Sequence, residues 1–137
     1  MVDHVTKERR SWLMSRVKSK DTSPELRVRK AAHSLGLRFR LHRKDLPGKP
    51  DLVFPKHKTA IFVHGCFWHR HKNCPKATTP KSRRDFWLEK FAANVSRDER
   101  VSLELRDRGW LVETIWECET KIDGPLRAQL MDIFGLE

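Results

Sequence analysis

The chain has 137 residues, which is the size of one folded domain, and its hydrophobic fraction of 38% excludes a disordered tail. Its formal net charge is +11, and a surplus of that size favours an anionic partner, most commonly a phosphate backbone. No stretch combines length, apolarity and few charges, so no membrane partner is expected. A soluble basic protein without a charged partner is the alternative at this level.

The N-terminal segment, residues 1–21, is predicted to be a basic arm, followed by a single domain over residues 22–137. Trp12, Met14 and Val17 are apolar, so part of the arm could be a docked helix. For residues 1–10 a solvated tail is the alternative. No apolar signal segment follows Met1, and the protein is therefore expected in the cytoplasm.

The first predicted helix begins at Thr22-Ser23-Pro24-Glu25, where a hydroxyl can cap, Pro enters the first turn, and Glu25 can close a capping box with Thr22. Gly36 is a plausible end. The apolar residues between them recur at helical spacing and are Val28, Ala31, Ala32 and Leu35.

Three short strands are expected next. Apolar and polar residues alternate over 37–42, which predicts a half-exposed strand. A turn at 46–50 precedes the apolar run 52–54, and 60–63 is nearly all apolar, as in a buried central strand. The runs 52–54 and 60–63 are predicted to pair as a hairpin.

The second half begins with an irregular segment, 64–80, rich in Cys, His and aromatic residues. A long helix is expected from Ser82 to Arg108, with a break near 94–97. Its inner face is predicted to consist of Leu88, Phe91, Val95, Val101 and Leu105. A strand at 110–116 and a helix opening at Gly124-Pro125 follow. This order predicts an α/β fold, a mixed central sheet flanked by helices.

Glu25, Asp51 and His69 form a candidate catalytic group. Asp51 follows a turn and directly precedes an apolar strand, a position from which a carboxylate can hold a hard divalent cation. Such a cation polarises a phosphoryl oxygen and acidifies a bound water, and Glu25 could bond metal-bound waters. The alternative for Asp51 is an ordinary turn aspartate, and that for Glu25 is the capping box alone. Glu25 can both cap the helix and bind metal-bound waters.

The three cysteines favour a metal site. Cys66, His71 and Cys74 have the spacing C-x4-H-x2-C, and Cys118 follows the strand at 110–116. An odd number of cysteines argues against a disulfide framework, while three thiolates and one imidazole are a typical ligand set for structural Zn²⁺. Buried free cysteines are the alternative.

Aromatic residues lie beside basic ones in the same region. Phe67 and Trp68 sit between a Cys and a His, and Trp87 is close to Arg83, Arg84 and Lys90. Large apolar side chains in this setting can wedge into a base stack. Ordinary core packing is the alternative, and it is the favoured reading for an isolated Trp in a helix.

Several motifs together resemble the very-short-patch-repair (Vsr) endonuclease family. They are Val-His-Gly-Cys-Phe-Trp-His-Arg-His at 63–71, Leu-Pro-Gly-Lys-Pro-Asp at 46–51, Phe-Trp-x-x-Lys at 86–90, Asn-Val-x-Arg-Asp at 94–98 and Trp-Glu-Cys at 116–118. The run from Met14 to Glu25 also fits. The resemblance covers residues 7–118, and several separate motifs in the right order make coincidence improbable.

The resemblance implies a restriction-endonuclease-like fold and an enzyme that nicks the T-containing strand at T:G mismatches, which arise when 5-methylcytosine deaminates. It implies Mg²⁺ on Asp51 and the Val63 backbone carbonyl, His69 as general base with Glu25 and His64 in support, and structural Zn²⁺ on the Cys3His set. The residues implied to contact DNA are Met14, Phe67, Trp68, Trp87, Lys90 and Asn94. A monomer is expected, associated with mismatch-repair proteins and a companion cytosine-5 methyltransferase.

Three features depart from the family or nuclease pattern. Val63 replaces a Thr, which a backbone carbonyl ligand tolerates. One extra residue precedes Cys74. No acid-x-Lys follows at the second strand, so His69 takes the role of that Lys in activating water. The alternatives are a nuclease specific for a sequence or structure in matched or branched DNA, and a non-catalytic zinc module that binds DNA.

Overall fold

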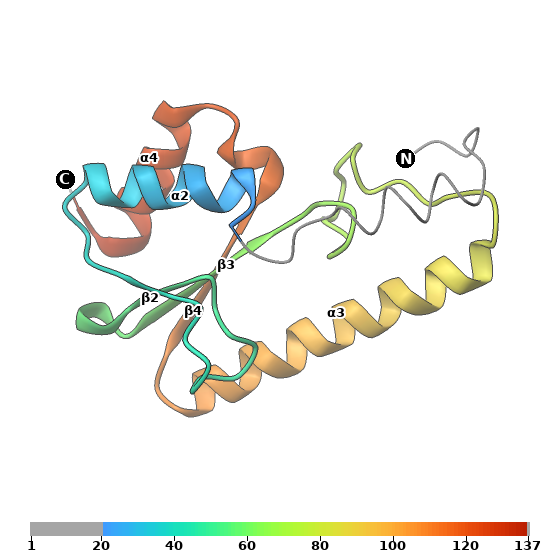
Figure 1. Ribbon diagram of the computed structural model, residues 1–137, viewed down its shortest axis with the longest axis horizontal. Coiled ribbons are helices and arrows are strands. Elements are labelled where there is room, and N and C mark those ends of the chain that lie inside the picture. The colour runs from blue at the N-terminus through green and yellow to red at the C-terminus, as the bar shows by residue number, and fades with distance from the viewer. Residues whose placement is uncertain (1–20, 137) are drawn as a thin grey trace.

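A four-stranded sheet organises the computed structural model, which describes residues 21–136 (Figure 1). The strands are β1 (Arg40–Leu41), β2 (Leu52–Phe54), β3 (Thr59–His64) and β4 (Leu111–Trp116), in that spatial order. β1–β2 and β2–β3 pair antiparallel, whereas β3–β4 pair parallel. The predicted mixed sheet and the β2–β3 hairpin are confirmed. The basic arm and Met14 lie outside the described residues, apart from Asp21.

Helices cover both faces of the sheet. On one face, α2 (Ser23–Ser34) and α4 (Asp123–Phe134) pack against alternate strand residues, among them Leu52, Phe54 and Ile61. On the other face, the C-terminal part of α3 (Arg84–Asp107) packs through Leu105 on Val53 and Ala60. The alternation follows from the two-residue period of a strand, and each buried Leu or Phe contributes about 1.5–3 kcal/mol. The predicted mixed sheet flanked by helices is confirmed.

The start of α2 follows the prediction with one change. The Thr22 hydroxyl accepts a hydrogen bond from the Glu25 backbone N–H at 3.4 Å, as a helix cap should. The Glu25 carboxylate accepts from the backbone N–H of Asp21, at 3.1 Å, and not from that of Thr22. Glu25 therefore also fixes the residue that precedes the cap.

The predicted strand at 37–42 is much shorter than expected. Only Arg40 and Leu41 pair, because the neighbouring β2 has three residues and offers partners only at Val53 and Leu52. His42 then adopts a left-handed backbone with φ +48°, which ends the strand. Of the apolar residues in 37–42, Leu37 is buried and Phe39 half-buried, whereas Leu41 is 41% exposed, so the alternation does not correspond to a full strand with one buried face.

α3 runs without the predicted break, and its inner face differs from the prediction by one position. Asn94 remains helical because its side-chain amide donates to the Trp68 carbonyl at 3.2 Å and does not compete for its own helix backbone. Trp87 and Phe91 are buried, whereas Leu88 is 42% exposed. The contact with the 64–80 segment therefore sets which side of α3 faces inward.

The chain between β3 and the middle of α3, residues 65–95, forms what we call the distal lobe. It contributes no residue to either hydrophobic cluster on the sheet. In Figure 1 the chain leaves the end of β3, runs past the sheet and turns back into α3. Among the described helices, none has the length and apolarity needed to cross a membrane.

Candidate active site and metal-ligand group

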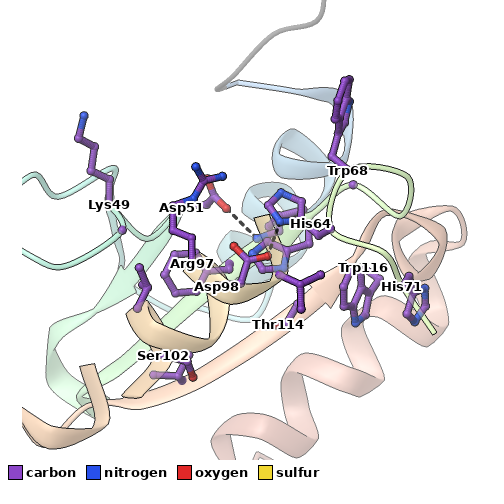
Figure 2. Close-up of a pocket in the computed structure, with 18 of the residues that line it drawn as sticks. Lys49, Asp51, His64, Trp68, His71, Arg97, Asp98, Ser102, Thr114 and Trp116 are labelled. Carbon is purple, nitrogen blue, oxygen red and sulfur yellow. Dashed lines mark hydrogen bonds and ion pairs between the residues drawn. The ribbon is translucent and has the colours of Figure 1, made fainter. Parts of the chain in front are cut away.

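An open cleft of about 1960 Å³ lies between the α2 N-terminus, the 42–51 loop, the end of β3 and one side of α3. Small-molecule pockets measure roughly 300–1,000 Å³, so the size of this cleft suits a macromolecule. Asp51, His64 and Asp98 approach one another in it, and Trp68 stands on the loop beyond them (Figure 2).

Asp51 lies at the entrance to β2, facing β3. Its Oδ2 accepts a hydrogen bond from the backbone N–H of Val63 at 2.7 Å. Burial, with a smaller contribution from the nearby carboxylate of Glu25, raises the pKa of Asp51 to about 7, although the hydrogen bond from the Val63 N–H opposes the shift. The carboxylates of buried Glu25 and half-buried Asp51 offer oxygen ligands whose negative charge a hard divalent cation would neutralise, so the residues fit such a cation.

Glu25 is buried and receives three hydrogen bonds on the same oxygen, Oε2. The donors are Arg29 Nη2, His42 Nε2 and the Asp21 N–H, each at 3.1 Å. His42 Nε2 also lies 3.9 Å from Asp51 Oδ1. The sequence analysis assigned no role to Arg29 or His42. Glu25 and Arg29 have i,i+4 spacing, which could have predicted their pairing. His42 lies outside this helix, so no local sequence pattern predicts its contact with Glu25.

His69 and His64 stack with their ring centroids 3.9 Å apart and their planes 7° from parallel. His69 Nδ1 lies 2.6 Å from Asp98 Oδ2, on α3. Burial, with a smaller contribution from the adjacent His69, lowers the pKa of His64 to about 4, so His64 is neutral at physiological pH. Asp98 was missed as a site residue, although it ends the Asn-Val-x-Arg-Asp motif.

The cysteines form a separate group with His71. One ligand atom from each of Cys66, His71, Cys74 and Cys118 lies within 4.8 Å of the others. His71 Nδ1 is 3.6 Å from Cys66 Sγ and 3.5 Å from Cys118 Sγ. The extra residue before Cys74 is accommodated, with Asn73 in a left-handed conformation at φ +59°.

The chemistry of this group fits a bound metal ion. Burial raises the pKa of Cys66 to about 12 and also raises that of Cys118, whereas the Lys76 backbone N–H lowers that of Cys74. A coordinated cation deprotonates thiols outright, which offsets the cost of burying them as thiolates. Three sulfurs and one imidazole nitrogen form a set that could hold a metal, and His69 is not part of it.

The aromatic residues of the distal lobe pack on one another. Phe67 contacts Trp68 and Phe91 with centroids 5.1 Å apart in each case, and Trp68 lies 5.8 Å from Trp87. Trp87 is 5% exposed, while Phe67 and Trp68 are half-buried. Of the three predicted wedge residues, Trp87 is therefore the buried one, and Phe67 and Trp68 pack on the cluster from its more exposed side.

Lys90 and Asn94 lie on α3 beside Trp68. The Lys90 ammonium is 5.9 Å from the centre of the Trp68 ring, and Asn94 donates to the Trp68 carbonyl. Arg70 lies against Phe91, with its guanidinium 4.0 Å from the ring centre, and donates to the carbonyls of Phe67, Ala77 and Thr78. These contacts give the distal lobe a fixed shape.

The fold and the cleft define a restriction-endonuclease-like α/β protein. The catalytic domain of the homing endonuclease I-Bth0305I has a similar structure, with a TM-score of 0.59. The alignment covers 84% of this chain and 96% of that domain at 22% sequence identity. This likeness places the fold alone.

Sequence relatives place the family. The family model for the DNA mismatch endonuclease Vsr matches residues 2–76. The type II nicking enzyme V.XorIIP of Xanthomonas oryzae is 51% identical over 97% of this chain and 97% of its own length. The DNA mismatch endonuclease Vsr of Escherichia coli is 42% identical over 86% of this chain and 75% of its own length. The chain belongs to the Vsr family and is a DNA endonuclease.

Proposed function

We propose that this endonuclease uses Mg²⁺ to nick the T-containing strand at T:G mismatches, the mispairs left when 5-methylcytosine deaminates. The observation that supports it best is the placement of half-buried Asp51 and the His69–Asp98 pair in one open cleft. The name of the Escherichia coli relative supports action on mismatches.

Asp51 and the Val63 carbonyl are the proposed ligands of the catalytic cation. In an antiparallel ladder the N–H and C=O of one residue point to the same neighbour, and the Val63 N–H points to Asp51. The carbonyl of Val63 is therefore on the side of Asp51 as well. A bound Mg²⁺ supplies polarisation of a phosphoryl oxygen and a more acidic water.

His69 is the proposed general base. Its Nδ1 faces the Asp98 carboxylate at 2.6 Å, which fixes the tautomer that leaves Nε2 unprotonated. Neutral His64 stacks on the ring and holds its plane. With that orientation His69 can take a proton from an attacking water. Glu25, beside Asp51, is proposed to hydrogen-bond the waters of the cation.

Cys66, His71, Cys74 and Cys118 are the proposed ligands of a structural Zn²⁺, because three sulfurs and a nitrogen match its preferred set. Cys118 belongs to η2 (Glu117–Thr120), directly after β4, whereas the other ligands belong to the distal lobe. The site would join the lobe to the sheet and set the position of His69, which lies in the same loop.

Phe67 and Trp68 are the proposed wedge at the mispair, supported from below by Trp87 and flanked by Lys90 and Asn94. A T:G wobble pair stacks and pairs less well than a matched pair, so opening the adjacent step costs less of the few kcal/mol that unstacking demands. Preference for the mismatch can thus come from deformability as well as from base contacts.

The test is nicking of T:G and matched T:A duplexes of equal sequence with Mg²⁺ and with a chelator. We expect Mg²⁺-dependent nicking of the T strand in the T:G duplex only, and none by Asp51→Ala, which should still bind DNA. Equal nicking of both duplexes would indicate a nuclease for matched DNA. Metal-independent binding without nicking would indicate a non-catalytic module.

A further inference from the structure

We propose that His42 is a positioning residue that holds the Glu25 and Asp51 carboxylates in the arrangement that a divalent cation requires. Its Nε2 lies 3.1 Å from Glu25 Oε2 and 3.9 Å from Asp51 Oδ1, so one imidazole contacts both acids. The inference rests on the proposed function, because it concerns the same metal site.

The backbone of His42 is held in a costly conformation that directs the ring inward. Its φ is +48°, a left-handed value that costs a non-glycine residue about 1–3 kcal/mol and persists only where the surrounding contacts hold it. The His42 N–H also donates to the Asp51 carbonyl at 3.4 Å. His42 is thus bonded to Asp51 through the main chain and to Glu25 through the side chain.

The position of His42 is not explained by a need to compensate the negative charge of buried Glu25. Arg29 already pairs with the same oxygen at 3.1 Å, and the Asp21 N–H donates to it as well. Arg29 lies on α2, the same helix as Glu25, so neither donor connects Glu25 to the sheet. His42 provides that connection, since it follows β1 and reaches both the helix and the entrance to β2.

The same contacts argue against a cation held by His42 itself. Asp21, Glu25 and His42 offer ligand atoms within 4.8 Å of one another. The Arg29 guanidinium, however, contacts Asp21 at 2.6 Å and Glu25 at 3.1 Å, and its positive charge repels a second cation there. The three donors Arg29, His42 and the Asp21 N–H all use Glu25 Oε2. The Asp51 side chain also hydrogen-bonds to the Glu25 carboxylate, so the two acids lie together on the side of Glu25 that faces β2.

The expected effect is on metal affinity more than on chemistry. Removing a residue that orients metal ligands usually lowers affinity about 10- to 100-fold. We therefore expect His42→Ala to weaken binding of Mn²⁺, used as a paramagnetic stand-in for Mg²⁺, by about that factor. At saturating metal, kcat should fall less than tenfold, because His42 does not contact the reacting atoms.

The experiment measures Mn²⁺ binding to the full zinc-loaded chain without DNA, by electron paramagnetic resonance of the free ion, and then nicking against Mg²⁺ concentration. The variants are His42→Ala, His42→Gln, which keeps an N–H donor of similar reach, and Asp51→Ala. His33→Ala, which removes an exposed imidazole from α2, is the matched control. Thermal unfolding and zinc content are measured for all variants.

We expect His42→Ala to require more Mn²⁺ and more Mg²⁺, His42→Gln to recover most of the loss, and His33→Ala to match the wild type. Loss in Asp51→Ala with wild-type behaviour of His42→Ala overturns the inference and leaves the proposed function intact. A loss in His42→Ala that Gln does not restore, with lowered thermal stability, also overturns it, since the role is then structural. Unaltered Mn²⁺ binding in Asp51→Ala overturns both proposals.

Discussion

The sheet with its helices and the distal lobe are stabilised by different kinds of contact. The sheet body has two apolar clusters, one on each face, filled by alternate residues of β2 and β3. The lobe, residues 65–95, has instead a group of possible metal ligands, a ring cluster and the hydrogen bonds of Arg70. The body therefore depends on burial of apolar surface, whereas the lobe depends on a few specific contacts that bring functional groups together.

The largest effects are expected within the lobe, where His69 and His71 lie two residues apart and have different proposed roles. His69→Ala should lower the nicking rate about 100- to 10,000-fold, the loss typical of a missing general base, and leave zinc bound. His71→Ala should lose zinc, because its Nδ1 lies among the cysteine sulfurs. Metal analysis with single-turnover nicking measures both, and the reverse pattern would show that the two roles are exchanged.

Leu126 tests the sheet body alone. Leu126 belongs to α4 and is 1% exposed in the cluster between the sheet and the helices α2 and α4, so Leu126→Ala should lower the free energy of unfolding by about 2–5 kcal/mol. Molecules that remain folded should nick at the wild-type rate. Leu103→Ala, at a position 59% exposed, is the control and should change stability by less than about 0.5 kcal/mol. Chemical denaturation measures the stability, and nicking is measured at denaturant concentrations below the unfolding transition. Slower nicking by the folded Leu126→Ala protein would contradict the proposal that the sheet body affects stability but not chemistry.

Cys118 tests the link between the two regions. Cys118→Ala should release zinc and, by displacing the loop that carries His69, lower nicking about 100-fold, since a shift near 1 Å can cost that much. The sheet should persist, because Cys118 belongs to neither apolar cluster. Circular dichroism, zinc content and nicking rate provide the check. Full activity without zinc would refute a metal-dependent lobe.

Trp68 gives the smallest expected effect. Trp68→Ala should reduce binding to T:G duplexes by about 1–3 kcal/mol, the usual contribution of one stacked ring, and narrow the preference over matched DNA. Phe91→Ala, in the buried base of the same ring cluster, should lower stability instead. Fluorescence anisotropy with both duplexes measures the difference. If Trp68→Ala unfolds the protein, the residue is a core residue and the wedge proposal fails.

The sequence predicted the sheet body better than the lobe, for physical reasons. Periodicity and caps located α2, the β2–β3 hairpin and α4, because each buries a face whose spacing is written locally. The length of β1 was wrong because it depends on how many partners β2 offers, which no local pattern records. The inner face of α3 was wrong at Leu88 for the same reason, since the neighbouring loop selects Trp87.

The site divides in a similar way. Residues with distinctive chemistry in short motifs, such as Asp51 and Cys66, could be proposed from the sequence, and the cysteines and His71 lie together as the spacing indicated. Asp98 and His42 were assigned no role because their partners lie 29 and 17 residues away. Pairs of this kind follow from tertiary register alone.

The parallel pairing of β3 and β4 has an evolutionary consequence. Parallel neighbours require a long crossover, and here that crossover contains the entire distal lobe, which starts beyond His64 and returns through α3 to Leu111. Substitutions within the lobe, residues 65–95, change no residue of either apolar cluster. Relatives can thus vary the proposed DNA-contacting surface while keeping one scaffold, and the lobe of one relative could be transferred to the sheet of another.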